Sequence, residues 1–137
     1  MIGRALSTSA SKPATVVIFG GNGFVGTNIA KSILTRAPTA KVICISRSGQ
    51  PKVIRDGLHQ VEWHNGDVFK PETYSNKLNE ADCVVSCIGA FGSNEWMERM
   101  NGDANILAAS EAIRAKAKRF IYISTTENTL PEFVLKG

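Results

Sequence analysis

The sequence predicts an α/β fold in which helices cover both faces of one parallel sheet. Two observations carry this prediction. Short apolar runs alternate along the chain with segments of helical periodicity. The runs are continuous rather than alternating, which is typical of strands buried on both faces. Right-handed crossovers between such strands give a doubly wound sheet of the Rossmann type, for which we expect the strand order 3-2-1-4-5.

Three strands and one long helix are predicted in the first half of the chain. The first strand, Val16–Phe19, runs into a group of glycines. A helix follows and is ended by Pro38. Its apolar face consists of Val25, Ile29, Ile33 and Leu34. The second and third strands are Val42–Ile45 and Val61–Trp63.

The second half repeats this alternation. A short helix at Tyr74–Asn79 precedes a fourth strand at Cys83–Ile88. A long helix, Glu95–Lys118, leads to a fifth strand at Arg119–Ser124, after which we expect the sheet to be truncated. We expect the inward face of the long helix to be Met97, Met100, Ala104, Leu107 and Ala108.

Length and charge limit the classes of function. The chain has 137 residues, enough for one domain. No apolar run approaches the ~18 residues that span a bilayer. Residues 1–55 carry eight basic side chains and no acid, whereas residues 56–137 carry eight bases and twelve acids. This asymmetry indicates that the chain binds nucleic acid or a phosphorylated ligand, or that it retains part of a targeting segment. We expect no nucleic-acid partner, because the basic side chains are not accompanied by aromatic residues on which nucleotide bases could stack.

Residues 1–14 lie outside the predicted domain, which we place at residues 15–137. The segment contains Arg4, Lys12, several hydroxyl side chains and no acid. This composition indicates an organellar targeting remnant; a disordered tail is the alternative.

The cysteines and histidines indicate neither a disulfide framework nor a metal site. Three cysteines are an odd number without paired spacing. His59 and His64 have no cysteine at zinc-binding spacing.

A glycine-rich turn follows the first strand. Its residues are Gly20, Gly21, Asn22, Gly23, Phe24, Val25 and Gly26. They match both G-x-G-x-x-G and G-x-x-G-x-x-G. Glycine permits a sharp turn, close approach of a pyrophosphate and close packing of helix on strand. The helix N-terminus adds free N–H groups and a partial positive charge. The turn therefore predicts a dinucleotide site; a ligand-free βα turn is the alternative.

The end of the second strand predicts which dinucleotide binds. NAD-binding sites carry an acid here that accepts from the ribose 2′-OH. This chain has Ser46, Arg47 and Ser48 instead. An arginine and two hydroxyls can bind a 2′-phosphate that a carboxylate would repel. We therefore expect NADP(H) to be preferred over NAD(H), unless Arg47 is only a solvated loop residue.

Several segments together resemble a known superfamily. They are VVIFGGNGFVG, SRSGQP, GDVF, VVSCIGAFGSNEWMERMNGDANI and KRFIYIS. These resemble the atypical short-chain dehydrogenase/reductase (SDR) superfamily over residues 15–137, and especially its organellar NAD(P)-binding proteins. That group is similar to a mitochondrial SDR-like protein linked to coenzyme Q synthesis and, more distantly, to the 39 kDa accessory subunit of complex I.

The resemblance implies a role for each segment of the site. Gly20, Gly23 and Gly26 would form the phosphate turn, which Asn22, Phe24 and Val25 line. The adenosine ribose would meet Ser46, Arg47 and Ser48. The adenine would lie beside Asp67 and Val68. The nicotinamide ribose would lie along Cys87, Ile88, Gly89 and Ala90. The hydroxyl beside the reactive ring would come from Ser124 or Thr125. From the residues alone, Asp67 is equally well a turn or cap residue, and Cys87 a core cysteine.

The chain departs from the superfamily at the catalytic pair. SDR enzymes use a Tyr and a Lys four residues apart, on a helix after the fifth strand. The sequence ends at Gly137, just where this motif should begin, and neither Tyr74 nor Tyr122 supplies the pair. We therefore expect an oxidoreductase-family protein that is not active as this chain. The alternative is a non-catalytic nucleotide-binding accessory subunit of a membrane-associated respiratory or photosynthetic complex.

Partners and localisation follow from the same observations. Within the fifth strand, Phe120–Ile123 would form an apolar edge that pairs with further protein. That protein would be the chain's own C-terminal half or a complex. The resemblance implies a mitochondrial protein, in the matrix or at the inner membrane, with the chloroplast as alternative. It also implies a connection to ubiquinone biosynthesis and allows a peripheral membrane association.

Overall fold

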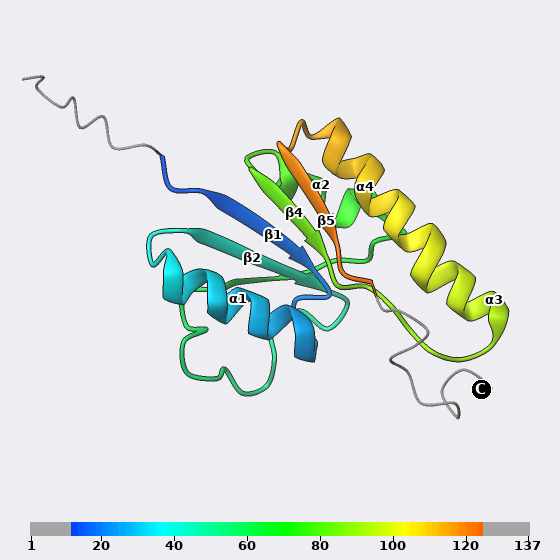
Figure 1. Ribbon diagram of the computed structural model, residues 1–137, viewed down its shortest axis with the longest axis horizontal. Helices are drawn as coiled ribbons and strands as arrows, with labels where there is room; N and C mark the ends of the chain where they lie inside the picture. The colour runs from blue at the N-terminus through cyan, green and yellow to red at the C-terminus, as the bar shows by residue number, and fades with distance from the viewer. Residues whose placement is uncertain (1–11, 125–137) are drawn as a thin grey trace, which may run out of the picture.

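Five parallel strands form one sheet in the order β3-β2-β1-β4-β5 in the computed structural model (Figure 1). The structure describes residues 12–124. The strands are β1 (Thr15–Phe19), β2 (Lys41–Ser46), β3 (Glu62–Asn65), β4 (Cys83–Ser86) and β5 (Arg119–Tyr122). The predicted class and strand order are confirmed. Both β4 and β5 end two residues earlier than predicted.

The strands end at a common edge of the sheet. Phe19, the last residue of β1, pairs with Ile45 of β2 on one side and with Ser86 of β4 on the other. Ser86 in turn pairs with Tyr122, the last residue of β5. Because β1 is followed by β2 on one side and β4 on the other, the strand order reverses at this edge. Such a reversal is where ligands bind in open α/β sheets.

Helices pack on both faces of the sheet, and two apolar clusters form the core. One face is covered by α1 (Phe24–Arg36), which buries Ala30 and Leu34 against Ile18 and Val42. The other face is covered by η1 (Pro71–Thr73), α2 (Ser75–Leu78) and the run α3 (Asn94–Met97), η2 (Glu98–Asp103) and α4 (Ala104–Arg114). No helix among the described residues is long and apolar enough to cross a membrane.

The helix predicted at Glu95–Lys118 differs from the observed one. It begins earlier, at Asn94, and ends earlier, at Arg114; between them η2 is π-helical. The residues buried on α4 are Ala104, Asn105, Ala108 and Ala112. Met97, Met100 and Leu107, which we expected to face inward, are only half-buried. The reason is that a π turn holds one more residue than an α turn, so the residues before it and after it do not share one helical periodicity.

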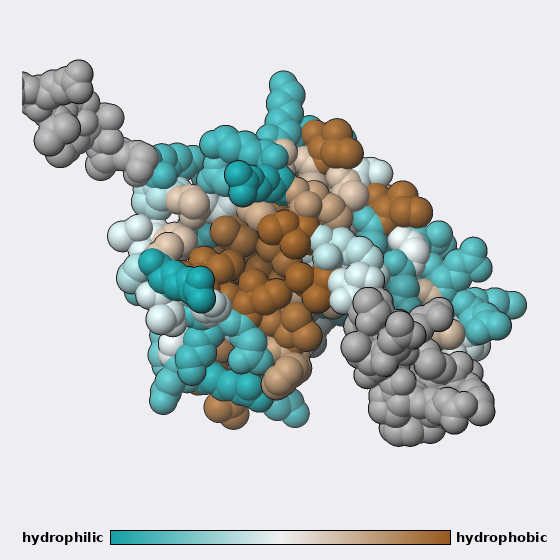
Figure 2. Space-filling view, viewed as in Figure 1, coloured by the Kyte–Doolittle hydropathy of each residue, from teal (hydrophilic) through white to brown (hydrophobic). Residues whose placement is uncertain are grey.

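Apolar side chains remain exposed over part of the sheet. Figure 2 shows them gathered in the middle of the visible face, between α1 and β5. Ile121, Tyr122 and Ile123 are 45%, 42% and 38% exposed. Within residues 12–124, no strand pairs with the outer side of β5. The apolar edge that the sequence predicts is therefore present in the described part of the chain.

Candidate functional site

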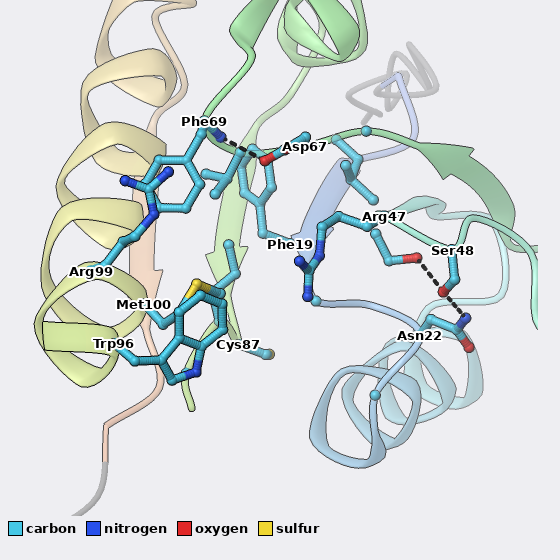
Figure 3. Close-up of a pocket in the computed structure, with 18 residues that line it drawn as sticks. Phe19, Asn22, Arg47, Ser48, Asp67, Phe69, Cys87, Trp96, Arg99 and Met100 are labelled. Atoms are coloured by element: carbon cyan, nitrogen blue, oxygen red, sulfur yellow. Dashed lines mark hydrogen bonds between the residues drawn. The ribbon is translucent and has the colours of Figure 1, made fainter. Parts of the chain in front are cut away.

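A cavity of about 850 Å³ opens at the edge where the strands end (Figure 3). The loops after β1, β2, β3 and β4 line it, together with residues of α3 and η2. Its lining includes eleven residues that the sequence predicts for the site: Gly20, Asn22, Gly23, Ser46, Arg47, Ser48, Asp67, Val68, Cys87, Ile88 and Gly89. The other lining residues are Phe19, Ile45, Gly66, Phe69, Trp96, Arg99 and Met100. The volume lies within the range of small-molecule and cofactor sites.

Three glycines of the turn are required by the fold itself. Gly20 has a φ of +72°, a conformation that residues with a side chain rarely adopt. A Cβ on Gly21 would lie 2.4 Å from the Cβ of Cys44, and a Cβ on Gly26 would lie 2.4 Å from the carbonyl oxygen of Gly20. Gly21 and Gly26 are buried beneath the turn rather than in the cavity.

Gly23 is different, because no internal contact requires a glycine there. A Cβ on this residue would meet only the Gly20 carbonyl oxygen, at an ordinary 3.4 Å. Gly23 is exposed, lines the cavity and caps the N-terminus of α1 with an extended backbone. The first turn of α1 carries no acid. A cavity-facing backbone without a side chain, at a helix N-terminus, is suited to an anion.

Phe24 and Val25 do not line the main cavity. Their side chains are 79% and 44% exposed at the start of α1. Phe24 lines a smaller cavity, of about 320 Å³, on the other side of the turn, with Val53, Arg55 and other residues. The proposed phosphate turn therefore lines the main cavity with its backbone and with the side chain of Asn22.

Side-chain hydrogen bonds fix the loop after β2 against the glycine turn. The Asn22 amide donates to Ser48 Oγ at 2.8 Å and to the Gly49 carbonyl at 3.3 Å. From the neighbouring strand, Asn65 Nδ2 donates to the Arg47 carbonyl at 2.7 Å. With its backbone held in this way, Arg47 extends its side chain along the cavity toward the glycine turn (Figure 3). Its guanidinium has no partner among the described residues, so it is available to a ligand.

The loop after β3 forms a turn of its own. Asp67 Oδ1 accepts from the Phe69 N–H at 3.0 Å, and Thr73 Oγ1 is 3.0 Å from the Asp67 nitrogen, which donates to it. The carboxylate of Asp67 thus has the turn role that the sequence left open, and it also faces the cavity. Next to it, the Arg99 guanidinium lies 4.0 Å from the centre of the Phe69 ring. This cation–π pair forms the wall across the cavity from Arg47 (Figure 3).

The loop after β4 is held from η2. Ala90 does not line the cavity, but its N–H donates to Asn101 Oδ1 at 2.9 Å and its carbonyl accepts from Asn101 Nδ2 at 3.0 Å. Burial raises the pKa of the Cys87 thiol, which lies in the cavity. The thiol is therefore protonated at neutral pH, a state in which it is a poor nucleophile.

Sequence reasoning missed Trp96, Arg99 and Met100 because it treated their segment as a regular helix facing the core. One signal was available: Ser93 accepts a capping hydrogen bond from the Trp96 N–H at 3.3 Å, and serine is a preferred N-cap residue. A helix starting at Asn94 would have placed this turn close to the end of β4. The π turn itself had no recognisable signal.

The candidates for proton transfer lie away from the cavity. Ser124 is exposed beyond the end of β5 and does not line the cavity, and Thr125 lies outside the described residues. The Tyr74 hydroxyl is buried, where it donates to the Val68 carbonyl at 2.9 Å. Tyr122 lies on β5 and does not line the cavity either. Residues 12–124 contain no cluster of three or more His, Cys, Asp or Glu that could hold a metal ion.

Comparison with known proteins identifies the family. The model of the NAD dependent epimerase/dehydratase family matches residues 16–129. The chain belongs to this family. Its resemblance to the SDR superfamily is thereby confirmed, and nicotinamide dinucleotides are the cofactors of the family.

Two curated relatives and one solved structure illustrate the similarity. The "Uncharacterized protein At1g32220, chloroplastic" of Arabidopsis thaliana is 40% identical over 92% of this chain and 42% of its own length. MIOREX complex component 2 of Saccharomyces cerevisiae is 34% identical over 58% of this chain and 30% of its own. The chain thus spans less than half of each relative. The WbmH enzyme of Bordetella bronchiseptica, solved with NAD+, shares the fold at a TM-score of 0.63 and 20% identity, over 80% of this chain and 38% of that one.

Proposed function

We propose that this member of the epimerase/dehydratase family binds NADP(H) in the cavity, in preference to NAD(H). The observation that carries the proposal is the end of β2. Ser46, Arg47 and Ser48 line the cavity there, and residues 46–55 carry no carboxylate. An unpartnered guanidinium beside two hydroxyls suits a phosphate monoester, whereas NAD(H) is favoured by an acid at this place.

The remaining residues fit the other parts of the dinucleotide. The exposed backbone at Gly23 and the N-terminus of α1 would take the pyrophosphate. Asp67 and Val68 would take the adenine, and Cys87, Ile88 and Gly89 would lie along the nicotinamide ribose, with Ala90 anchoring their loop to Asn101. Bound NADP(H) would supply hydride transfer at its nicotinamide ring. The chain's own residues would bind and orient the cofactor.

Calorimetric titration of the protein with NADPH and NADH tests this proposal. We expect tighter binding of NADPH. Arg47→Asp should weaken NADPH binding by about ten- to a hundredfold, since a charge-assisted hydrogen bond contributes about 1.5–3 kcal/mol. The matched variant Arg47→Lys keeps the charge and should lose less. An unchanged ratio of the two affinities in Arg47→Asp would contradict the role of Arg47, and wild-type protein that binds neither cofactor would contradict the function.

A second candidate is a non-catalytic accessory subunit that retains the nucleotide as a structural element. Within residues 12–124, neither Tyr74 nor Tyr122 reaches the cavity. One relative is named as a component of a complex. This candidate predicts NADPH binding without NADPH oxidation by any carbonyl compound, and migration of the native protein with a larger assembly. Oxidation of bound NADPH by a ketone or aldehyde would instead support the oxidoreductase.

The cellular setting belongs to the same proposal. We place the protein in mitochondria, in the matrix or at the inner membrane, with a role linked to ubiquinone biosynthesis. The chloroplast is the alternative, favoured by the name of one relative. The apolar edge at Ile121 and Ile123 would be covered by further protein, either more of this polypeptide or a complex. Microscopy of the full chain with a C-terminal fluorescent tag distinguishes the two organelles.

A further inference from the structure

Asn105 is a buried polar residue in an otherwise small and apolar helix face. It is 7% exposed, and its buried neighbours on α4 are Ala104, Ala108 and Ala112. Burial of an amide is unfavourable unless its hydrogen bonds are made. An alanine or leucine would pack on the sheet without that requirement. The presence of asparagine at this position therefore calls for an explanation in terms of the groups it contacts.

The Asn105 side chain bonds with two separate segments. Its Oδ1 accepts from the hydroxyl of Ser86, the fully buried last residue of β4, and its Nδ2 lies 3.1 Å from the Ile88 carbonyl, to which it donates. The same Nδ2 also donates to the carbonyls of Met100, at 3.4 Å, and Asn101, at 3.1 Å. One amide thus joins the loop after β4 to the end of η2.

The Asn105 amide also bonds two carbonyls inside η2, those of Met100 and Asn101. At the junction, the Ala104 N–H reaches back five residues to the Arg99 carbonyl, which is the π pattern. These carbonyls lie five and four residues before Asn105, within η2 and just ahead of the change from π to α. π turns are uncommon, and many of them lie at functional sites.

The π turn determines which side chains face the cavity. Trp96, Arg99 and Met100 line it from α3 and η2. In a regular α-helix, removal of the extra residue would rotate the segment before it by about 100° relative to α4. Trp96 and Arg99 would then leave the cavity wall, and the Phe69–Arg99 pair would separate.

We propose that Asn105 is a positioning residue for the cofactor cavity. It holds the π turn against the loop after β4 and so fixes the wall that carries Trp96, Arg99 and Met100. Asn101 of η2 also holds this loop, because its side chain forms hydrogen bonds with both the N–H and the carbonyl of Ala90. The inference rests on the proposed function for its affinity measurement; its structural part can be tested without any cofactor.

The test compares Asn105→Leu with Ala108→Gly. Ala108 is fully buried one turn later on α4 and does not touch the cavity, so its variant controls for loss of stability alone. Both variants are measured under conditions in which their free energies of unfolding are equal. We expect Asn105→Leu to bind NADPH about tenfold more weakly or worse than the wild type. Ala108→Gly should keep its affinity within about twofold. If both variants lose NADPH affinity in proportion to their loss of unfolding free energy, the proposal is overturned.

Two cofactor-free measurements separate this inference from the proposed function. Backbone amide exchange in the segment 88–90 and the fluorescence of Trp96, assigned with Trp96→Phe, should both change in Asn105→Leu and not in Ala108→Gly. Unchanged exchange and emission would overturn the positioning role, whether or not the wild type binds NADPH. If Asn105→Leu does not fold, Ser86→Ala removes only the link to β4 and should produce the same changes, smaller in size; their absence would count equally against the proposal.

Discussion

At the residue scale, the glycine turn separates positions that serve the fold from one that is open to a ligand. Gly20, Gly21 and Gly26 have internal reasons to be glycine: a positive φ or a contact that any Cβ would violate. Gly23 has neither, and it faces the cavity. A sequence motif cannot make this distinction, because all of these glycines fit the spacing equally well.

The distinction predicts opposite results for two alanine substitutions. Gly23→Ala should change the free energy of unfolding by no more than about 1 kcal/mol, the usual range for a cap position. It should lower dinucleotide affinity by about tenfold or more, because the new methyl group would occupy the place that we propose for the pyrophosphate. Gly26→Ala should cost about 1–3 kcal/mol or more in stability, because its Cβ overlaps the Gly20 carbonyl. Urea unfolding and calorimetry measure both quantities. A Gly23→Ala protein with wild-type affinity would exclude pyrophosphate binding at this backbone.

Local residue patterns were sufficient for the half of the cavity formed by β1 and β2. Gly20 and Gly23 follow the apolar strand β1, and Ser46–Ser48 lie at the end of β2; all of them line the cavity. Phe69 and Arg99 could not be predicted in the same way. They lie 30 residues apart in sequence, and their contact depends on η2, where Asn101 forms hydrogen bonds with Ala90 of the loop after β4 that no local pattern reveals.

At the element scale, β3 is an edge strand whose charged side chains connect it to its neighbours. Glu62 on β3 pairs with Lys77 of α2, at 2.5 Å, and with Lys41 of β2, at 3.6 Å. The hydrogen bond from Lys77 lowers the pKa of Glu62, in spite of a smaller opposing effect of burial. Charges on an edge strand also discourage pairing with other chains.

This pairing predicts a contribution to acid sensitivity. Because the pKa of Glu62 is lower in the folded chain, its contribution is complete above the pKa of the unfolded chain, near 4.3, and is lost as the pH falls through the folded value. Glu62→Gln should reduce the unfolding free energy at pH 7 by less than about 1 kcal/mol, since the group is partly exposed. The difference between variant and wild type should shrink as the pH falls below about 4.3. A difference that stays constant from pH 7 to pH 3 would show that the ion pairs do not stabilise the strand.

The long helix shows where element prediction reaches its limit. Apolar spacing correctly indicated a helix between β4 and β5, but it gave a continuous helix with methionines facing inward. The observed helix changes register in η2, and its buried face is Ala104, Asn105, Ala108 and Ala112. Helical periodicity assumes one pitch throughout. A π turn stabilised by distant partners violates that assumption without changing the composition of the segment.

At the scale of the whole molecule, the division of charge along the chain corresponds to a division of the cavity. Residues 12–55, which contain β1, α1 and β2, carry no carboxylate, and they form the wall with Arg47. The opposite wall contains the acid Asp67, together with Arg99. The asymmetry that the sequence ties to a phosphorylated ligand thus lies at the place where we propose the phosphates of the cofactor bind.

Each of the two core layers contains one buried group whose titration lowers stability at alkaline pH, and these groups supply the last prediction. Cys44 lies in the cluster beneath α1 and Tyr74 in the cluster beneath α4. Burial is the main cause that raises the pKa of each group to about 12. Both are neutral when protonated, so the unfolded chain loses these protons first as pH rises. Stability is therefore complete below about pH 8.5 and falls above it.

The pH dependence of the unfolding free energy distinguishes the contribution of Cys44 from that of Tyr74. Each group should lower the unfolding free energy by up to about 1.4 kcal/mol per pH unit, beginning near pH 8.5 for Cys44 and near pH 10 for Tyr74. Urea unfolding from pH 7 to pH 11 measures the profile. Cys44→Ala should flatten it from about pH 8.5, and Tyr74→Phe only above about pH 10, although both variants start from lower stability at pH 7 because each alters a buried side chain. Profiles parallel to that of the wild type would mean that the two core layers do not control unfolding at alkaline pH.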